Sequence, residues 1–354
     1  MNLNPKRLYR GLRRRINALM STYRQGPRSN MAVFAIRRGG STLLADMLSA
    51  ERGVLMIDEP FLVQRDHPTL PFKSRWLERR QHSAYFDFSE AERDRAQAYM
   101  QEVLAGKAPF GVCRYPWFLF RADRMLLKIL HAPALLDWVA SSFGIQVVRL
   151  LRHPAPQALS VLRAGWQMDA EAYFSRPEFL ATFLSDDQIE FGARILAEGS
   201  AWRKAILDWS LMYRMLVHLS KTPSPLLTYE ELLIDPLGTS RFLCNHFQLR
   251  DLDRVSACVR NPSSSPGGCS PDNLEYIRSG DSWMLIQSWL KKLDATQLEQ
   301  AQAILDRYEV EIYNMSSPLP DPARAGLRAS SRISVPTITR TDPRAVSAPA
   351  SLAG

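Results

Sequence analysis

A basic, glycine-rich turn, Arg38-Gly-Gly-Ser-Thr42, holds the residue types best suited to binding an anion. Glycine lets the backbone approach a phosphate closely, and the first amides of a following helix add donors and the positive end of the helix dipole. The lysine of the GxxxxGK[ST] loop is missing, and the cation, Arg38, stands before the glycines instead. The turn therefore predicts a phosphate loop other than that of Mg-nucleotide triphosphate enzymes. The alternative is an ordinary turn with a solvated arginine pair.

A second pair of anion-binding residues, Arg152 and Ser160, lies eight residues apart in the sequence. Eight residues are about two helical turns, so the two side chains share a helix face if a helix begins near Pro154. A guanidinium binds phosphate through two hydrogen bonds at once, and a hydroxyl adds another donor. The pair predicts a second phosphate clamp, and its alternative is an ordinary strand-end charge.

Short apolar stretches before both motifs indicate the elements that position them. Residues 31–35 and 145–151 read as buried strands, and a helical pattern follows the first turn as far as about Ser49. We expect an α/β fold, with a central parallel sheet flanked by helices in three layers. Ligands of such sheets bind at the carboxyl ends of the strands, so both loops should face one ligand with phosphate groups at its two ends.

Four segments of the chain resemble the sulfotransferases that use 3′-phosphoadenosine 5′-phosphosulfate (PAPS), whose fold is P-loop-like. Arg38–Leu44 looks like their 5′-phosphosulfate loop, and Arg152–Ser160 looks like their 3′-phosphate motif with the same spacing. Leu226–Pro236 is similar to the segment whose tyrosine lies against the adenine. Arg278–Trp283 resembles a shortened form of the element that closes over the 3′-phosphate. The segments occur in family order between about residues 31 and 313.

The resemblance implies a PAPS site, with adenosine 3′,5′-bisphosphate (PAP) as the product and no metal. Two residues depart from the family pattern: Gly39 replaces a serine or threonine, and Ser279 replaces a lysine. Because Ser279 carries no charge, we expect the last segment to bind the 3′-phosphate more weakly. The residues expected to bind the cofactor are Arg38, Gly39, Gly40, Ser41, Thr42, Leu43, Arg152, Ser160, Tyr229, Arg278, Ser279 and Gly280. Arg38 is also expected to stabilise the leaving group during catalysis.

The general base has two candidates. Residues 53–57 read as a second strand, and Glu59 follows it directly before a proline, as in the carbohydrate sulfotransferases, where a similar glutamate is the proposed base. Alternatively, Glu59 caps the loop or pairs with an arginine. The small-molecule branch instead uses a histidine two residues after a strand lysine. Here His131 is three residues from Lys128, which on a strand turns it to the opposite face. The alternative is that His131 begins the following helix, and it is kept as the second candidate for that reason.

These patterns predict an enzyme that transfers a sulfuryl group by in-line displacement to a hydroxyl, most consistent with a carbohydrate or glycolipid acceptor. A tyrosyl or small-alcohol acceptor is the nearest alternative within the family. A nucleotide-binding or membrane-tethered scaffold that has lost transfer is the alternative outside it. The identity of the acceptor, the position sulfated and the oligomeric state stay open.

Composition divides the chain into an arm, a body and a tail. Residues 1–30 contain eight Lys or Arg and no acid, with apolar residues at helical spacing, so we expect a basic amphipathic arm. Residues 31–314 are expected to form the catalytic domain, with a helical insertion over the active site at about 164–219. Residues 315–354 are rich in Ser, Pro, Ala and Arg and are expected to be disordered. The insertion should shape the acceptor site.

Most of the formal charge of +9 lies at the two ends, and the body is nearly neutral, which argues against a nucleic-acid partner. The arm either binds an anionic membrane surface or packs on the body. No secretory signal and no run of 18 apolar residues is found, so we expect a cytoplasmic enzyme, peripheral to the inner face of the membrane. The four cysteines lack a disulfide pattern, and no metal-ligand motif occurs.

Overall fold

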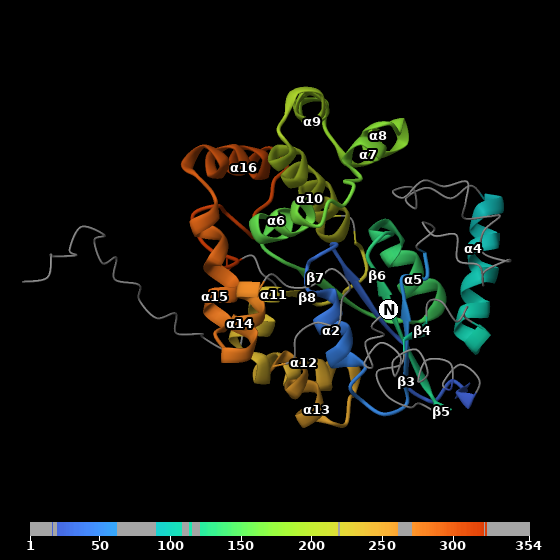
Figure 1. Ribbon diagram of the computed structural model, residues 1–354. Coiled ribbons are helices and arrows are strands. Elements are labelled where there is room, and N and C mark those ends of the chain that lie inside the picture. Colours follow the sequence, from blue (N-terminus) through green and yellow to red (C-terminus); the bar gives the residue numbers. More distant parts are fainter. Residues whose placement is uncertain are drawn as a thin grey trace, which may run out of the picture.

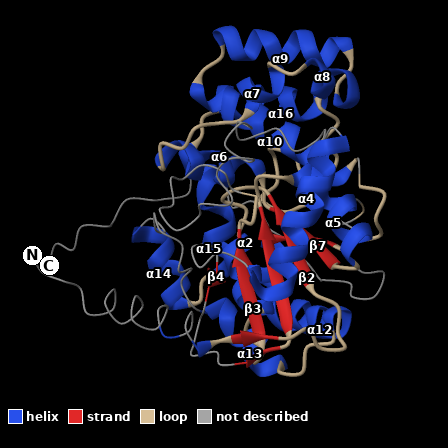
Figure 2. Ribbon diagram, turned by 90° about the vertical axis from the view of Figure 1, so that its right-hand side faces the viewer, coloured by secondary structure: helices blue, strands red, loops and turns tan. Residues whose placement is uncertain are grey.

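The computed structural model describes residues 16, 20–61, 90–107, 113–114, 121–218, 220–260, 271–321 and 323. Most of the basic arm that the sequence predicts, and residues 324–354 of the predicted tail, lie outside the described residues. The apolar pattern of the sequence produces a sheet with helices on both sides, and Figure 2 shows this three-layer arrangement along the strands.

The central sheet has six strands in the order β4-β3-β6-β2-β7-β8. Five of them are parallel, and β4 runs antiparallel to β3 at one edge. The predicted central parallel sheet is therefore confirmed, with an antiparallel edge strand that the sequence did not predict. The strands are β2 (Met31–Ala35), β3 (Val54–Asp58), β4 (Cys113–Arg114), β6 (Arg124–Ile129), β7 (Gln146–Leu151) and β8 (Leu226–Thr228). A separate pair joins β1 (Thr22–Tyr23) to β5 (Arg121–Ala122).

Both faces of the sheet are buried, which explains why its strands are apolar without a polar alternation. In β2, Ala32 and Phe34 face one hydrophobic cluster, and Met31, Val33 and Ala35 face the other. The first cluster includes residues of α4 (Glu90–Glu102), α5 (Leu136–Phe143), α6 (Pro154–Arg163), α10 (Ala201–Val217) and α16 (Ala295–Arg307). The second includes residues of α2 (Ser41–Leu48), α11 (Tyr229–Ile234), α12 (Pro236–Phe247), α13 (Leu252–Ala257) and α15 (Ser282–Gln287).

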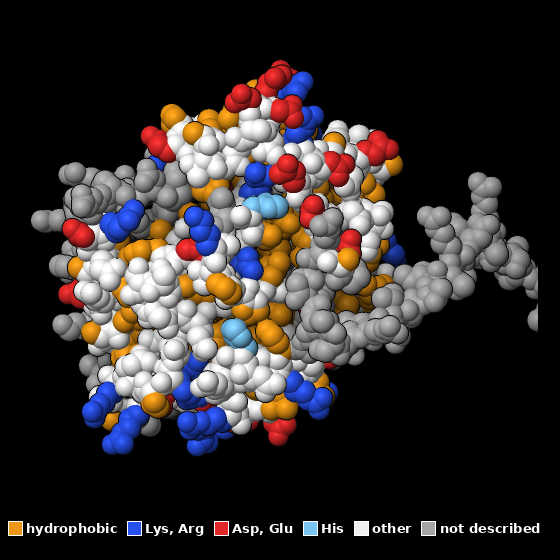
Figure 3. Space-filling model, turned by 180° about the vertical axis from the view of Figure 1, so that it is seen from behind, with side chains coloured by type: hydrophobic (Ala, Val, Ile, Leu, Met, Phe, Trp, Pro, Cys, Tyr) orange, Lys and Arg blue, Asp and Glu red, His pale blue; other side chains and the backbone are white. Residues whose placement is uncertain are grey.

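Four helices occupy the segment that the sequence analysis treats as an insertion. They are α7 (Ala170–Phe174), α8 (Pro177–Phe183), α9 (Asp186–Glu198) and α10, and with α16 they form the upper part of the molecule in Figure 1. Seen from behind, acidic and basic side chains gather at this upper end, and hydrophobic side chains are visible across the middle of the face (Figure 3). The remaining elements are short: α14 (Pro271–Ser279), a π-helical turn at Val103–Lys107, and 3₁₀ turns at Pro133–Leu135, Cys258–Arg260 and Ser288–Lys292.

The order of the strands places the topological switch point of the sheet at the carboxyl end of β2. The chain leaves β2 for β3 and β6 on one side of it, and then crosses to β7 and β8 on the other. Such a reversal of direction opens a space between the neighbouring loops, where open α/β sheets bind their ligands. The loop after β2 lies at this point.

The folded chain extends beyond both ends of the domain expected from composition. At the N-terminal side, β1 pairs with β5, and the Arg28 guanidinium lies 2.6 Å from the Glu51 carboxylate. At the other side, Met315 is buried, and the Asp321 N–H donates to the Ile312 carbonyl at 2.8 Å. Residues 21–30 and 315–321 therefore pack on the body.

Candidate active site

Within three residues of its end, each of the five parallel strands is followed by a residue that the sequence predicts to lie in the site. Arg38 follows β2, Glu59 follows β3, His131 follows β6, Arg152 follows β7 and Tyr229 follows β8. Because parallel strands end at one edge of the sheet, these five residues lie along the same edge.

The two predicted phosphate clamps touch each other. Arg38 Nε donates a hydrogen bond to Ser160 Oγ at 2.9 Å, and Arg152 Nη1 donates to the Arg38 carbonyl at 3.2 Å. Arg38 adopts the left-handed backbone region, with φ of 61°, which turns the chain sharply before the glycines. The loop after β2, Arg152 at the end of β7 and Ser160 within α6 thus form one cationic cluster with a hydroxyl.

The aromatic ring of Tyr229 completes this cluster. The Arg152 guanidinium carbon lies 4.6 Å from the centre of the ring, and the ring also packs directly on the backbone of Gly40. Ser41 and Thr42 follow at the first turn of α2, where Ser41 is buried, and the N-cap of this helix has no side-chain bond. The amides of that turn are suited to bind an anion.

Both glycines of the turn are required by their surroundings. Gly40 has φ of 92°, and a Cβ there would stand 2.3 Å from Tyr229 Cδ2. At Gly39, a Cβ would stand 2.7 Å from the Ile36 carbonyl oxygen, which accepts the Gly39 N–H at 3.0 Å. A serine or threonine at position 39 would therefore not fit this turn without a shift of the backbone.

Gly40→Ala should disrupt this turn. The change adds the cost of a left-handed alanine and forces the Tyr229 ring away, so we expect a loss of about 1–3 kcal/mol of unfolding free energy. Urea unfolding measures this loss, and Gly144→Ala is the matched control, because Gly144 also has positive φ but open space around it. An equal loss in both variants would mean that contact with Tyr229 contributes nothing.

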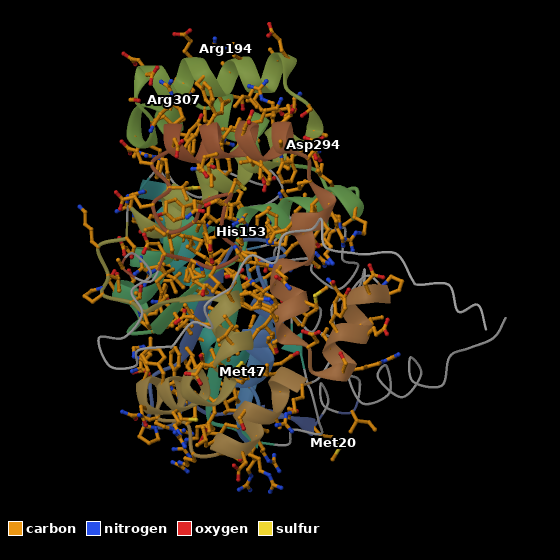
Figure 4. The ribbon with its side chains drawn as sticks, turned by 90° about the vertical axis from the view of Figure 1, so that its left-hand side faces the viewer. Met20, Met47, His153, Arg194, Asp294 and Arg307 are labelled. Atoms are coloured by element: carbon orange, nitrogen blue, oxygen red, sulfur yellow. The ribbon has the colours of Figure 1, made fainter. Side chains whose placement is uncertain are left out.

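Buried polar contacts fix the position of Arg152. Trp209 Nε1 donates to the Arg152 carbonyl at 3.1 Å, and the next residue, His153, donates its N–H to the Glu230 carboxylate at 3.0 Å. Glu230 also accepts the Tyr313 hydroxyl at 2.8 Å. His153 lies in the middle of the molecule, below the helices that carry Arg194 and Arg307 (Figure 4). The sequence analysis missed these supporting residues.

The ring of His153 has a structural role. Its Nδ1 accepts the Ala155 N–H at 3.2 Å and so caps α6, and its Nε2 lies 3.1 Å from the Asn314 carbonyl. Burial lowers the pKa of His153 to about 4, because the charged form cannot be solvated there. The imidazole is therefore neutral at pH 7, and its packing on Trp289 holds the start of α6.

Glu59 is a buried carboxylate at the end of β3. Leu130 N–H donates to its Oε2 at 3.0 Å, while its Oε1 is buried without a hydrogen bond from the described part of the chain. Burial, the largest effect, raises the pKa of Glu59, and the neighbouring Asp58 charge adds to the rise. Lys128 and the backbone N–H groups of Leu130 and His131 act in the opposite direction, and the resulting pKa is about 7. Lys128 itself pairs with Asp58 at 2.9 Å. A carboxyl with this pKa can accept a proton near neutral pH.

His131 lies two residues beyond the end of β6 and is partly buried. The expected reversal of its side chain on a strand does not apply, because β6 ends at Ile129. The backbone N–H of His131 is near enough to the Glu59 carboxylate to lower its pKa, so the two candidate bases occupy neighbouring loops.

The last predicted segment, Arg278–Gly280, lies at the end of α14 and is exposed. Ser279 Oγ donates to the Tyr276 carbonyl at 3.1 Å, and Asp281 caps the following helix, α15. Helix α15 packs on α11, which begins at Tyr229.

The described residues lack two further kinds of feature. They contain no group of three or more His, Cys, Asp or Glu side chains placed to hold a metal ion. They also contain no helix with the length and apolar character needed to cross a membrane.

No protein-family model matches the chain, and neither does any curated protein sequence. Among solved structures, the chain is similar to the mouse sulfotransferase SULT7A1 complexed with PAP, at 10% identity and a TM-score of 0.38, over 83% of this chain and 89% of that one. It is also similar to the sulfotransferase domain of the Synechococcus PCC 7002 olefin synthase, at 14% identity and a TM-score of 0.41, over 83% and 100%. The sulfotransferase STF9 of Mycobacterium avium gives 12% identity and a TM-score of 0.35, over 76% and 78%.

These neighbours are sulfotransferases. They bear the name of the family whose motifs the sequence resembles. At such low identity and TM-score we base the function of this chain on the contacts of its own residues.

Proposed function

We propose that this protein is a PAPS-dependent sulfotransferase that acts on a hydroxyl group. The observation that carries the proposal is the contact between the two phosphate clamps. Arg38 from the loop after β2 bonds Ser160 on α6, Arg152 bonds the Arg38 carbonyl, and Tyr229 packs beside them. Two cations, a hydroxyl and an aromatic ring at one sheet edge suit an adenine nucleotide with two separate phosphate groups.

The residues present fit this cofactor. A β-carbon at Gly39 would meet the Ile36 carbonyl oxygen and one at Gly40 would meet the Tyr229 ring, so the two glycines let the loop turn closely beside Tyr229, the residue assigned to the adenine. Arg38, Ser41 and Thr42, with the first amides of α2, would hold the 5′-phosphosulfate. Arg152 and Ser160 would hold the 3′-phosphate, and Tyr229 would lie against the adenine. When bound, PAPS supplies the sulfuryl group.

The proposed reaction is a single in-line displacement. A bond forms between the acceptor oxygen and sulfur while the bond from sulfur to the 5′-phosphate oxygen breaks. Arg38 and the amides of α2 stabilise the negative charge that develops on that phosphate oxygen. Glu59 accepts the proton of the acceptor hydroxyl, for which its raised pKa of about 7 is suited.

A carbohydrate or glycolipid acceptor follows from the resemblance of Glu59-Pro60 to the carbohydrate branch of the family. In the helical segment 164–219, the aromatic residues Tyr173, Trp202, Trp209 and Tyr213 are buried in the core. Trp166 is different, because 39% of it is exposed and its ring lies 5.3 Å from the Arg38 guanidinium carbon. It is the residue we propose for contact with a sugar.

Isothermal titration calorimetry with PAP and AMP tests the cofactor assignment. We expect PAP to bind at least about 30-fold more tightly, because it alone engages the second clamp, and loss of one partner of a buried charged contact costs about 2–5 kcal/mol. ATP serves as the control for general binding of nucleotides. Equal affinity for PAP and AMP would overturn the assignment of Arg152 and Ser160.

We further propose that the basic arm holds the enzyme on the anionic inner face of a membrane. Because Tyr23 and Arg28 belong to the folded body, the variant to test lacks residues 1–20 only. That segment carries six of the arm's cations, at about 1 kcal/mol each near an anionic surface. We expect the deletion to abolish sedimentation with anionic vesicles at low salt and to leave PAP affinity unchanged. A lowered melting temperature in a protein that never bound vesicles would indicate packing on the body instead.

A further inference from the structure

Arg37, the neighbour of Arg38, points away from the proposed nucleotide site into a buried ion-pair cluster. Its Nη2 lies 3.2 Å from Asp169 Oδ2 and 3.5 Å from Asp208 Oδ2, and its Nη1 donates to the Gln167 carbonyl at 3.0 Å. All three charged residues of this Arg37 cluster (Arg37, Asp169 and Asp208) are buried. The cluster uses both terminal nitrogens of the guanidinium, so it fixes the orientation of the side chain.

The Arg37 cluster joins the loop after β2 to the first turns of the helical segment. Asp169 is the N-cap residue of α7, and its N–H donates to Asp208 Oδ1 on α10 at 2.7 Å. The Arg37 carbonyl accepts Gln157 Nε2 on α6 at 2.7 Å. The loop that carries Arg38 is therefore held by three helices, and α7 is held by the same contacts.

The segment fixed in this way begins at the one exposed aromatic residue beside Arg38. Trp166 directly precedes Gln167, whose carbonyl bonds Arg37, and the Trp166 ring stands 5.3 Å from the Arg38 guanidinium carbon. An acceptor must reach the sulfur next to the phosphate that Arg38 binds. It must therefore approach the neighbourhood of Trp166.

We propose that Arg37 is a positioning residue that couples the donor loop to segment 166–174, so that nucleotide bound at Arg38 orders the side of the site that receives the acceptor. The inference rests on the proposed function, because it takes the ligand of Arg38 to be PAP or PAPS. Coupling between sites is reciprocal, so an acceptor held by this segment would tighten nucleotide binding by the same factor. The bonds of Arg37 carry the coupling, and Arg37 itself touches neither ligand.

Hydrogen–deuterium exchange of the full-length protein, with and without saturating PAP, tests the coupling. In the wild type, PAP should slow exchange in segment 166–174 by about fivefold or more. A factor of about five corresponds to the lower end of the usual range of coupling free energies. Asp169→Asn keeps the size of the side chain and removes its charge. We expect it to bind PAP within about threefold of the wild type and to lose most of the slowing.

Two further variants make the result decisive. Glu171→Gln is the matched control, because Glu171 lies on the same helix with its side chain 73% exposed, and it should keep the full slowing. Arg37→Lys keeps the buried charge but lacks the planar guanidinium that makes two hydrogen bonds at once, so PAP should no longer slow exchange in segment 166–174 of this variant. This variant tests the coupling even if Asp169→Asn fails to fold. The inference would be overturned by wild-type protein that binds PAP without slower exchange in segment 166–174, or by Asp169→Asn and Arg37→Lys variants that both keep the slower exchange. Wild-type protein that binds no PAP would overturn the proposed function and the inference together.

Discussion

Glu59→Gln should lower the rate of sulfuryl transfer by about 10²–10⁴-fold, the usual contribution of a positioned general base. Glutamine matches the size of glutamate and can accept the Leu130 N–H as before, but it cannot take up a proton at neutral pH. PAP affinity should stay near the wild-type value, because Glu59 follows β3 while the proposed phosphate clamps follow β2 and β7. Single-turnover kinetics with saturating PAPS, beside calorimetry with PAP, separates the two effects.

The pH profile gives an independent measurement of the same group. Because only the carboxylate form of Glu59 can accept a proton, wild-type kcat/KM should rise with pH through an apparent pKa of about 7. Glu59→Gln should lose this inflection together with most of its rate. His131→Ala is the matched control in the neighbouring loop and should keep both. If the histidine variant is inactive and the glutamine variant is not, the carbohydrate-type assignment of the base is wrong.

The stability of the fold supplies a check that the glutamine variant is correctly folded. The pKa of Glu59 is higher in the folded protein, about 7, than its ordinary value of 4.5, so folding favours the protonated form. This contribution is complete below pH 4.5 and is lost as pH rises through 7, where the buried carboxylate becomes charged. Glutamine stays neutral throughout. Urea unfolding should therefore show the wild type losing stability relative to the variant as pH rises between these values, since groups such as Asp208 titrate in both proteins.

The strands and helices of the site could be predicted because each motif combines an apolar stretch with a residue, such as glycine or proline, that marks a turn or a helix start. Residues 31–35 and 145–151 were predicted as buried strands, and the structure has β2 and β7 there. The helix expected from Pro154 begins at that residue, since proline needs no donor in the first turn. The hydrogen bond from Arg38 to Ser160 joins the two motifs that the sequence placed at one sheet edge. Their roles toward a nucleotide stay predictions.

The residues that the sequence could not distinguish depend on contacts between distant segments. Arg37 and Arg38 are adjacent and identical in type, yet one is buried against carboxylates 132 and 171 positions away while the other lies beside Ser160. No local pattern assigns these two directions. Glu230 likewise follows a tyrosine in an ordinary helix start, and only tertiary packing brings it to His153 and Tyr313. The register argument for His131 did not apply, because a short apolar run does not show where β6 ends.

Arg152→Ala should remove the preference for a 3′-phosphate. We expect PAP affinity to fall by about 10²-fold, because truncating a partly buried charged partner of a phosphate costs 2–5 kcal/mol. AMP affinity should change by less than about threefold, since the 5′-phosphate is assigned to Arg38 and the amides of α2. The fold should survive, because Trp209 and Glu230 bond the backbone of this segment and not the Arg152 side chain.

Two graded variants distinguish loss of the clamp from a general disturbance of the site. Ser160→Ala removes one neutral donor and should lower PAP affinity by only about 3–10-fold. Arg152→Lys keeps the charge but loses the two-pronged contact, so it should fall between the wild type and Arg152→Ala. Arg152 Nη1 also bonds the Arg38 carbonyl, so a displaced loop would weaken AMP as strongly as PAP. Calorimetry that finds parallel losses for both nucleotides would assign Arg152 to support of the loop and leave the 3′-phosphate without its proposed ligand.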